Sequence, residues 1–379
     1  MTATPRRLNV LICGGGVAGA TLACLLGRAG HHTTVVERDQ GVRSSGNPVD
    51  VRRHAFDVMD ELDLVSRLRE LATQVRRLVL VDDTGRFITS MPTRRSQDRE
   101  LEIPRADLTA VLIAAARSDT DFRFNDSIME LGNDDRGVDV TFHRAAPQRF
   151  DLVVGADGVH STVRRLEFGP EPEYLTHLGL YVATVALQGP ADHADTILLH
   201  NEPGTATALH PGSGKPTALF IFRSPTRIDP RHTAAADALL TDTYRATRWR
   251  APELLDAYRA AKDTYFDSVS RVRVPTWHTG RVTLLGDAAS CVSLFGEGCS
   301  SAIIGAATLA AAHERSPTNI PAALARYEAT HRPVTTRGQR PAPFASHLLV
   351  PATATGIKIR DHALQIAHAI TPKNRLIEC

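Results

Sequence analysis

The sequence has few cysteines, few aromatic residues and almost no excess of charge of either sign. Its five cysteines are odd in number and lack the spacing of a zinc site, as is typical of a reduced, cytoplasmic protein without a disulfide framework. A formal net charge of +2 gives no electrostatic footprint for nucleic acid or for an acidic membrane surface. We therefore expect a cytoplasmic protein that does not bind nucleic acid. The cysteines are Cys13, Cys24, Cys291, Cys299 and Cys379.

Long hydrophobic runs are missing as well. No stretch has the roughly 18 uninterrupted apolar residues of a membrane-spanning helix. The segment from Leu8 to Leu26 follows Arg6-Arg7 and superficially resembles a secretion signal, but its three spaced glycines favour a nucleotide-binding loop instead. With 379 residues, 42% of them hydrophobic, the chain can bury a large core and is predicted to form about two or three lobes.

The N-terminal region contains the pattern of a dinucleotide-binding βαβ unit. A predicted strand over 8–13 leads through Gly14-x-Gly16-x-x-Gly19 into an Ala/Leu-rich helix. Gly14 permits the tight turn, Gly16 lets the backbone approach a pyrophosphate, and Gly19 lets helix and strand pack closely. The start of the helix offers unpaired N–H groups to the anion. The residues predicted at this loop are Gly14, Gly16, Val17, Ala18 and Gly19.

The second strand of this unit ends at Glu37 and Arg38. Glu37 lies about 20 residues beyond the loop, where a carboxylate accepts hydrogen bonds from ribose hydroxyls. Strand, loop, helix and acidic residue therefore agree on a dinucleotide site. The pattern alone leaves open whether the ligand is FAD or NAD.

Helix and strand signals alternate at both ends of the chain, whereas the middle is rich in strands. The stretch from 178 to 223 has several short strand patterns separated by Gly and Pro, which predicts an antiparallel sheet. Beyond Pro317, helical pieces separated by prolines predict a C-terminal helical region. Helices are predicted over 53–71, 106–117, 300–312, 321–328 and 357–368, and further strands over 77–81, 151–155 and 282–285.

Two further strand ends are followed by an aspartate beside a glycine. Asp157-Gly158 follows the first of these strands and precedes Ser161 and Arg164, and Gly286-Asp287 follows the other. Taken singly, each is typical of a turn, with Ser161 capping the next helix. Their order along the chain, after the glycine loop, indicates more about function than either motif does alone.

In that order, the motifs resemble those of the class A flavin-dependent aromatic hydroxylases, the family of p-hydroxybenzoate hydroxylase and the tetracycline-inactivating monooxygenases. The resemblance spans most of the chain and is nearest to the compact, tetracycline-destructase-like branch. The segments that carry it are the glycine loop with Glu37, Gly46 to Arg52, Ile103 to Leu108, Asp157 to Arg164, and Gly286-Asp287 with Gly296 and Gly298.

The resemblance implies an α/β fold in which a Rossmann-like FAD-binding domain is joined to an antiparallel-sheet substrate domain and a C-terminal helical segment. The boundaries that we predict are 1–72, 101–170 and 275–315 for the FAD-binding domain, 73–100 and 171–274 for the substrate domain, and 316–379 for the helical region.

The resemblance also implies roles for individual residues. Glu37 would bind the adenosine ribose, Arg105 the ribityl and pyrophosphate region, and Asp287 a ribityl hydroxyl. Asp157 would serve both FAD and the cleft where reduced nicotinamide docks. For Arg105, a surface charge that opens a helix is the alternative. The full predicted FAD set is Gly14, Gly16, Val17, Ala18, Gly19, Glu37, Arg38, Arg105, Asp157, Gly158, Arg164, Asp287, Gly296 and Gly298.

One segment departs from the family pattern. Between Ser290 and Gly298 the chain is one residue short and lacks the proline that relatives carry before the glycine pair. Glu297 would also place a carboxylate beside the flavin pyrimidine, where it opposes an anionic reduced flavin unless it points to solvent. A helix that begins near Cys299 favours that negative charge.

The function implied is that of a monooxygenase that uses NADPH or NADH and O₂. FAD would form a C4a-hydroperoxide and hydroxylate or epoxidise a bulky aromatic, polyketide or terpenoid-type small molecule, with no catalytic residue required from the protein. No second glycine loop is present for the nicotinamide cofactor. The alternatives are an FAD-dependent reductase or dehydrogenase on the same scaffold, or a non-catalytic flavin- or ligand-binding protein. A monomer or weak homodimer is expected.

Substrate contacts are predicted on the strand over 218–223 of the strand-rich region. Phe220, Phe222 and Arg223 are the candidates. The alternative for the two aromatic side chains is that they fill the core of this lobe. Because only 5% of all residues are aromatic, the walls of the substrate site are expected to be largely aliphatic.

Overall fold

A computed structural model describes residues 7–41, 48–93, 99–230, 232–292, 294 and 298–370. The chain divides into two compact units, each assembled from three separate segments. Unit 1 comprises residues 1–72, 99–178 and 270–342, and unit 2 comprises residues 73–98, 179–269 and 343–379.

Unit 1 is built on a sheet with the strand order β17-β18-β11-β1-β2-β7. The strands from β18 to β7 pair in parallel, and only β17 is antiparallel to its neighbour. Val, Leu and Ile dominate the central strands because both faces of such a sheet are covered. Their bounds are β1 Asn9–Cys13, β2 His32–Glu37, β7 Thr120–Phe124, β11 Leu152–Gly155, β17 His278–Thr279 and β18 Val282–Leu284.

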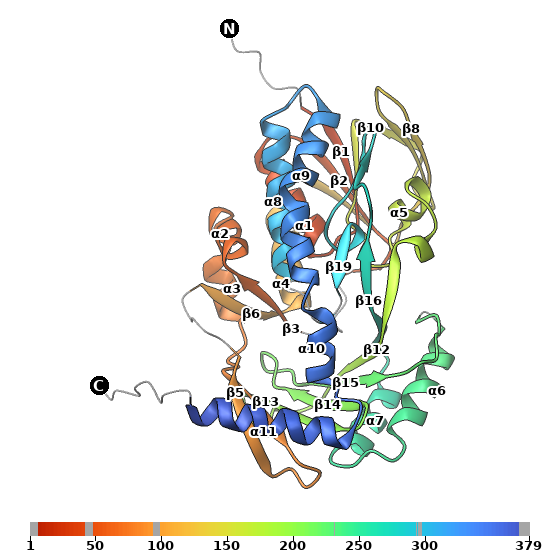
Figure 1. The fold of residues 1–379 in the computed structure, drawn as a ribbon. Helices are drawn as coiled ribbons and strands as arrows, with labels where there is room; N and C mark the ends of the chain where they lie inside the picture. Colours follow the sequence, from red (N-terminus) through yellow and green to blue (C-terminus); the bar gives the residue numbers. More distant parts are fainter. Residues whose placement is uncertain are drawn as a thin grey trace, which may run out of the picture. The chain divides into compact units, whose positions relative to one another are not determined.

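Three helices of unit 1 pack against one another beside this sheet, namely α1 (Val17–Arg28), α8 (Gly298–Glu314) and α9 (Ile320–Gln339) (Figure 1). Residues of these helices, of the parallel sheet and of a three-stranded antiparallel sheet form one hydrophobic core. The strands of that smaller sheet are β8 (Ile128–Asn133), β9 (Val138–Phe142) and β10 (Gln148–Phe150). This core holds the ends of the parallel strands in fixed positions.

Two helices of unit 1 differ in extent from those predicted from the sequence. The helix predicted over 53–71 is two helices, because Asp63 has a positive φ of 60° that interrupts the helical path. The helix predicted over 321–328 continues through Pro333 to the end of α9. The other bounds are β3 Pro48–Arg52, β6 Glu100–Pro104, β19 Ser290–Val292, α2 His54–Glu61, α3 Val65–Leu71, α4 Arg105–Ala116 and α5 Thr162–Glu167.

Unit 2 contains the strand order β16-β12-β15-β14-β13-β4-β5. β12, β15, β14 and β13 pair in antiparallel fashion, as predicted, but β13 and β4 are parallel. The bounds are β4 Arg77–Val81, β5 Phe87–Pro92, β12 Leu175–Ala186, β13 Thr196–Glu202, β14 Thr205–His210, β15 Thr217–Arg223 and β16 Thr264–Arg273.

Helices α6 (Thr233–Tyr244) and α7 (Ala251–Ala260) contribute to a second hydrophobic core with alternate residues of β12 and β15. Two later helices, α10 (Ala342–Leu349) and α11 (Ala354–Ile370), also contribute to this unit. The predicted C-terminal helical region is therefore divided, since 316–342 belongs to unit 1 and 343–379 to unit 2. The physical reason is that α9 buries its apolar side in the core of unit 1, whereas α11 contacts β5.

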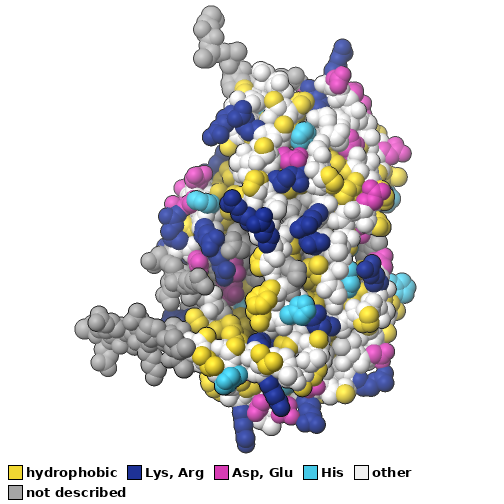
Figure 2. Space-filling model, viewed as in Figure 1, with side chains coloured by type: hydrophobic (Ala, Val, Ile, Leu, Met, Phe, Trp, Pro, Cys, Tyr) yellow, Lys and Arg dark blue, Asp and Glu magenta, His cyan; other side chains and the backbone are white. Residues whose placement is uncertain are grey.

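Among the described helices, none combines the length and the apolarity that a bilayer-spanning helix requires. On the face of the protein drawn in Figure 2, both Lys and Arg side chains and Asp and Glu side chains are present, scattered without a regular order.

Candidate functional site

The three predicted motifs meet at one edge of the parallel sheet of unit 1. Cys13, the last residue of β1, pairs with Val36 on one side and with Gly155 of β11 on the other. Gly155 in turn pairs with Leu284 of β18. Because the carboxyl ends of parallel strands lie at the same edge, the loops that follow these four strands are neighbours.

The three glycines of the loop have different surroundings, which explain why each position is glycine. Gly14 has φ +108°, and a Cβ on it would lie 2.4 Å from the backbone oxygen of Ala156. A Cβ on Gly19 would lie 2.0 Å from the backbone oxygen of Gly14, so α1 could not pack this closely on the loop. A Cβ on Gly16, in contrast, would meet no atom within 4 Å in the part of the chain that the structure describes. The fold requires the outer two glycines, whereas the space beside Gly16 is open.

The first turn of α1 leaves this open space electropositive. Gly16 is the N-cap residue, no side chain caps the helix, and no acidic residue lies in the first turn. The first N–H groups of a helix have no acceptor within the helix and carry the positive end of its dipole. This cradle fits a phosphate-bearing ligand, and Val17, Ala18 and Gly19 form it.

Glu37 ends β2 beside this loop. One of its carboxylate oxygens accepts a hydrogen bond from the Gly15 N–H at 2.8 Å, and the other accepts one from the Asp39 N–H at 3.0 Å. These bonds fix the orientation of the carboxylate, which keeps further lone pairs for hydroxyl donors. The next residue, Arg38, is exposed.

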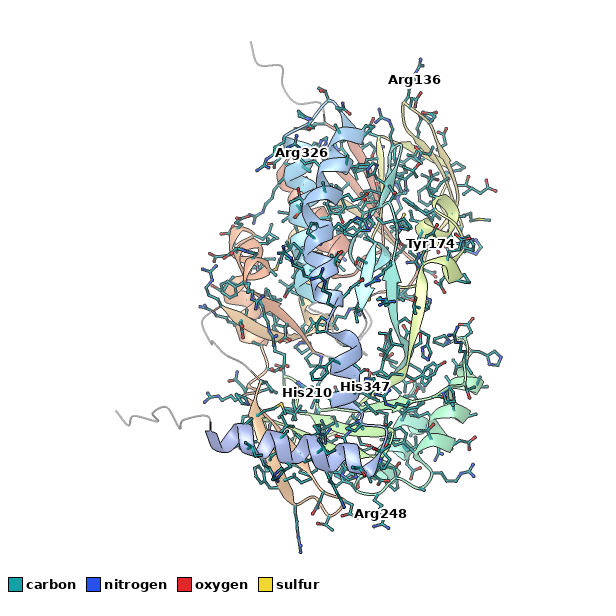
Figure 3. The ribbon with its side chains drawn as sticks, viewed as in Figure 1. Arg136, Tyr174, His210, Arg248, Arg326 and His347 are labelled. Carbon is teal, nitrogen blue, oxygen red and sulfur yellow. The ribbon has the colours of Figure 1, made fainter. Side chains whose placement is uncertain are left out.

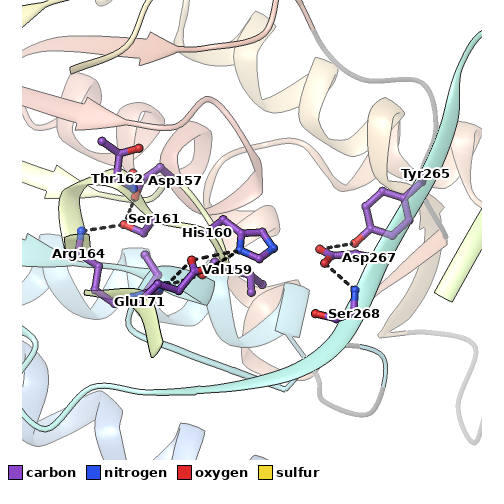
Figure 4. Close-up of polar contacts among 11 residues, drawn as sticks. Asp157, Val159, His160, Ser161, Thr162, Arg164, Glu171, Tyr265, Asp267 and Ser268 are labelled. Carbon is purple, nitrogen blue, oxygen red and sulfur yellow. Dashed lines mark hydrogen bonds and ion pairs between the residues drawn. The ribbon is translucent and has the colours of Figure 1, made fainter. Parts of the chain in front are cut away.

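Asp157 lies in a dense set of hydrogen bonds at the end of β11 (Figure 4). It accepts hydrogen bonds from the Ser161 hydroxyl at 2.5 Å and from the backbone N–H groups of Thr162 and Val163 at 2.7 and 3.1 Å. Burial raises the pKa of Asp157, whereas these hydrogen bonds lower it. Ser161 also accepts from the Arg164 N–H and so caps α5, as predicted.

Arg164 requires a correction, because its side chain is fully buried. Its guanidinium donates to the backbone oxygens of Val159 at 2.6 Å and of Ala288 at 3.1 Å, and it forms an ion pair with Glu171 at 3.3 Å. These contacts join the loop after β11 to the turn after β18. The guanidinium thus orders two motifs and points at protein groups rather than at a ligand.

The third motif lies against the starts of two helices. Gly286 and Asp287 form a single 3₁₀ turn after β18, and a Cβ on Gly286 would lie 3.0 Å from the side chain of Ala18 in α1. A Cβ on Gly298, the first residue of α8, would lie 3.7 Å from an Asp287 carboxylate oxygen. The motif therefore connects the glycine loop with the start of α8.

Charged groups surround the first turn of α8. The pKa of the Cys299 thiol is raised to about 12, chiefly by burial, while Arg105 lowers it and Asp50 and Asp287 raise it. Arg105 is the exposed first residue of α4. These electrostatic effects show that Arg105 and Asp287, which are far apart in the sequence, are close to the same turn.

Part of the predicted site lies outside the described residues. This applies to Gly46, Asn47, Gly296 and Glu297. Gly158 is described, has φ +80° and would accommodate a Cβ without contact, although the backbone conformation favours glycine.

Phe220 and Phe222 correct the predicted substrate contacts. Both side chains are fully buried in the core of unit 2, where each makes an edge-on contact with the ring of Tyr244. They fill the core of this lobe, which is the alternative that the sequence left open. Arg223 donates to the backbone oxygens of Val350 and Ser346 and so holds the end of β15 to α10 and to the residue that follows it.

A buried aromatic cluster behind the third motif was not predicted from the sequence. Trp277 packs against Tyr327 and His331 of α9, with ring centroids 5.7 and 6.1 Å away. All three side chains are buried. The signal was available, since Leu324, Tyr327 and His331 recur at the spacing of one helix face.

Comparisons with known proteins agree with this arrangement. The family described as FAD binding domain matches residues 7–339. An uncharacterized protein of Mycobacterium tuberculosis is 35% identical over 340 residues, which cover 87% of this chain and 91% of the relative. A flavin-dependent monooxygenase of Legionella longbeachae is 30% identical over 334 residues, covering 86% of each chain.

Solved structures show the same fold. The crystal structure of tetracycline destructase Tet(51) matches with a TM-score of 0.83 and 27% identity, covering 99% of this chain and 100% of that one. HpxO of Klebsiella pneumoniae complexed with FAD matches with a TM-score of 0.76 at 22% identity, covering 95% of each chain. The chain therefore belongs to the FAD-binding family of class A flavin-dependent monooxygenases, and its fold is that of the compact, tetracycline-destructase-like branch.

Proposed function

We propose that the protein is an FAD-dependent monooxygenase that takes electrons from NADPH or NADH and inserts one oxygen atom of O₂ into a bulky aromatic, polyketide or terpenoid-type small molecule. The observation that carries the proposal is the convergence of the glycine loop, Asp157 and Asp287 at one sheet edge, with open space above Gly16. The family membership and the names of the relatives support it.

The residues of unit 1 fit the parts of FAD in order. The first turn of α1 would hold the pyrophosphate, and the oriented carboxylate of Glu37 would accept from the adenosine ribose. Asp287 and Arg105 flank the start of α8 and would hold the ribityl chain. When bound, FAD supplies the redox chemistry that passes electrons from the nicotinamide cofactor to O₂.

Helix α8 would supply electrostatic stabilisation. It is long, and no acidic residue lies in its first turn. The positive end of its dipole favours negative charge at its N-terminus, and such charge develops on the pyrimidine ring of a reduced flavin. The chain needs no nucleophile for this chemistry, and we assign no catalytic residue.

The substrate is better assigned to the opposite face of the sheet in unit 2. Side chains alternate between the two faces of a strand. Phe220, Phe222 and the residues that pair with them on β14 therefore lie on the face that α6 and α7 cover. The other face carries Ile221, Ala206 and Ala208, which pair or neighbour one another across β14 and β15. His210 at the end of β14 belongs to the same face (Figure 3). In this proposal the small and aliphatic side chains of that face would contact the fused rings of the substrate.

FAD binding is tested first with purified protein. We expect a yellow protein with stoichiometric FAD, and we expect Asp287→Ala to lose the flavin while keeping the circular dichroism spectrum of the wild type. Asp256→Ala is the matched control, because Asp256 lies on the exposed side of α7 in unit 2. A colourless wild type that cannot be reconstituted with FAD would contradict the proposal.

Oxygenation is tested by following NAD(P)H oxidation and O₂ uptake with tetracycline, a fused-ring probe, and with simple phenols. We expect fused rings to stimulate both rates more than phenols do, and a product heavier by one oxygen atom. Consumption of NAD(P)H without oxygen in the product would instead indicate a reductase. Absence of any consumption would indicate a protein that binds flavin without turnover.

A further inference from the structure

A small cavity lies behind the third motif, entirely within unit 1. Its lining includes Gly286 and Ser290 on the turn after β18 and Gly298 and Ser301 at the start of α8, closed from the other side by Trp277 and His331. The space open to the centre of a water molecule is about 10 Å³, which is close to the requirement of a single water.

Two polar atoms of residues that line this cavity have no hydrogen-bond partner among the residues that the structure describes. They are the indole Nε1 of Trp277 and the imidazole Nδ1 of His331. The two side chains are 1% and 2% exposed, so bulk water does not reach them. Buried polar groups in native proteins are almost always paired with protein or with ordered water, so these two atoms point to an additional ligand.

His331 lies against α8 through its Nε2 atom. Nε2 lies 3.5 Å from the Ser301 hydroxyl, and a Cβ on Gly305 would lie 2.8 Å from that same nitrogen. His331 thus fits into a notch of α8 that only glycine leaves open. Burial lowers the pKa of His331 to about 4, so the ring is neutral near pH 7.

A neutral imidazole has one donor and one acceptor nitrogen, so Nδ1 takes whichever role Nε2 does not take toward the Ser301 hydroxyl. Trp277 Nε1 is a donor only. The two unpaired atoms belong to residues that line a cavity with space for about one water, and a water can accept from Trp277 Nε1 and pair with His331 Nδ1 in either tautomer. Ser290 and Thr335 also line the cavity, and their hydroxyl groups can form the remaining hydrogen bonds of the water.

We propose that a single buried water bridges Trp277 Nε1 to His331 Nδ1, and that this bridge makes His331 a positioning residue for the first turn of α8. The water orients the imidazole, and the imidazole contacts Ser301 and Gly305 of the helix. Gly286 and Gly298, which line the same cavity, belong to the segments assigned to the flavin. The positioning role rests on the proposed function, because the position of that turn would affect only the binding and the potential of FAD.

The water is tested on the wild-type protein alone, by a high-resolution crystal structure. We expect one ordered water within hydrogen-bonding distance of both nitrogens. We expect the water to disappear in Trp277→Phe, which removes the N–H group and keeps an aromatic ring. It should persist in His331→Asn, whose amide oxygen replaces Nδ1. An empty wild-type cavity, or a direct bond between the two side chains, would overturn the proposal.

The positioning role is tested by the dissociation constant and the reduction potential of bound FAD. In both variants we expect weaker FAD binding, by about tenfold, and a more negative potential, because α8 no longer holds its first turn in place. The matched control is His313→Gln, which removes another buried imidazole of α8, remote from this cavity. Unchanged FAD affinity and potential in Trp277→Phe would refute the positioning role. If the wild type bound no FAD, the proposed function would fail, and the crystal structure would still decide the water.

Discussion

Replacing Gly16 by alanine separates the stability of the glycine loop from its affinity for FAD. The backbone at Gly16 has φ −73° and ψ −173°, a conformation that alanine adopts without strain. Among the described residues, no atom lies within 4 Å of the added Cβ. A Gly→Ala change at such a position reduces the entropy of the unfolded chain, and we expect it to stabilise the apoprotein by about 0.4–1 kcal/mol.

The same methyl group would occupy the space where a pyrophosphate approaches the backbone. At FAD concentrations of 100 times the wild-type dissociation constant, bound ligand stabilises the wild type by about 2.7 kcal/mol. If the methyl group weakens binding by about a hundredfold, this stabilisation falls to about 0.4 kcal/mol. The variant therefore has a higher melting temperature than the wild type without FAD and a lower one with FAD.

Thermal unfolding with and without FAD measures this crossing, and flavin fluorescence gives the dissociation constants. Gly19→Ala is the contrasting variant, because its Cβ would lie 2.0 Å from a backbone oxygen and should destabilise the apoprotein by at least about 2 kcal/mol. If Gly16→Ala bound FAD as tightly as the wild type, or destabilised the apoprotein as Gly19→Ala does, the reasoning about the open cradle would be wrong.

Three further predictions concern stability. The pKa of His331 is about 4 in the folded protein and about 6.5 for histidine in an unfolded chain. The free energy of unfolding therefore falls as the pH is lowered from 6.5 to 4. His331→Gln should reduce the loss between pH 7.5 and pH 5 by about 2 kcal/mol, measured by denaturant unfolding. Ser161→Ala removes the cap of α5 and should cost about 1 kcal/mol, with no loss in Ser127→Ala as control. Tyr244→Phe leaves the Ala206 backbone oxygen without its donor and should cost about 1–2 kcal/mol without changing FAD affinity.

The position of the proposed cofactor cradle could be predicted because its signals are local. Each motif directly follows an apolar strand, and parallel strands bring their carboxyl ends together whatever the rest of the chain does. Ser161 as a cap and Gly19 as a packing residue follow from the same local rules. The sequence therefore indicated which residues meet, although they are more than a hundred positions apart.

The roles of Phe220, Phe222 and Arg164 could not be predicted, because they depend on partners that are distant in the sequence. Alternation places the two aromatic rings on one face of β15 but does not say which face α6 and α7 cover. A fully buried arginine is rare, and its partners Glu171 and Ala288 become neighbours only in the folded chain. His331 had a visible helical spacing, but its cavity exists only after α9 packs on α8.

The division of each unit into three segments constrains how the chain can fold during its synthesis. Sequential synthesis delivers β4 long before β13, with which it pairs, and β1 long before β18 completes the parallel sheet. α11, which contacts β5 through Gln365 and Ile88, is also synthesised long after β5. Neither core can close while the chain is still short, so folding should follow synthesis rather than accompany it. For the same reason, no single cut in the gene would yield either unit as an independent fragment.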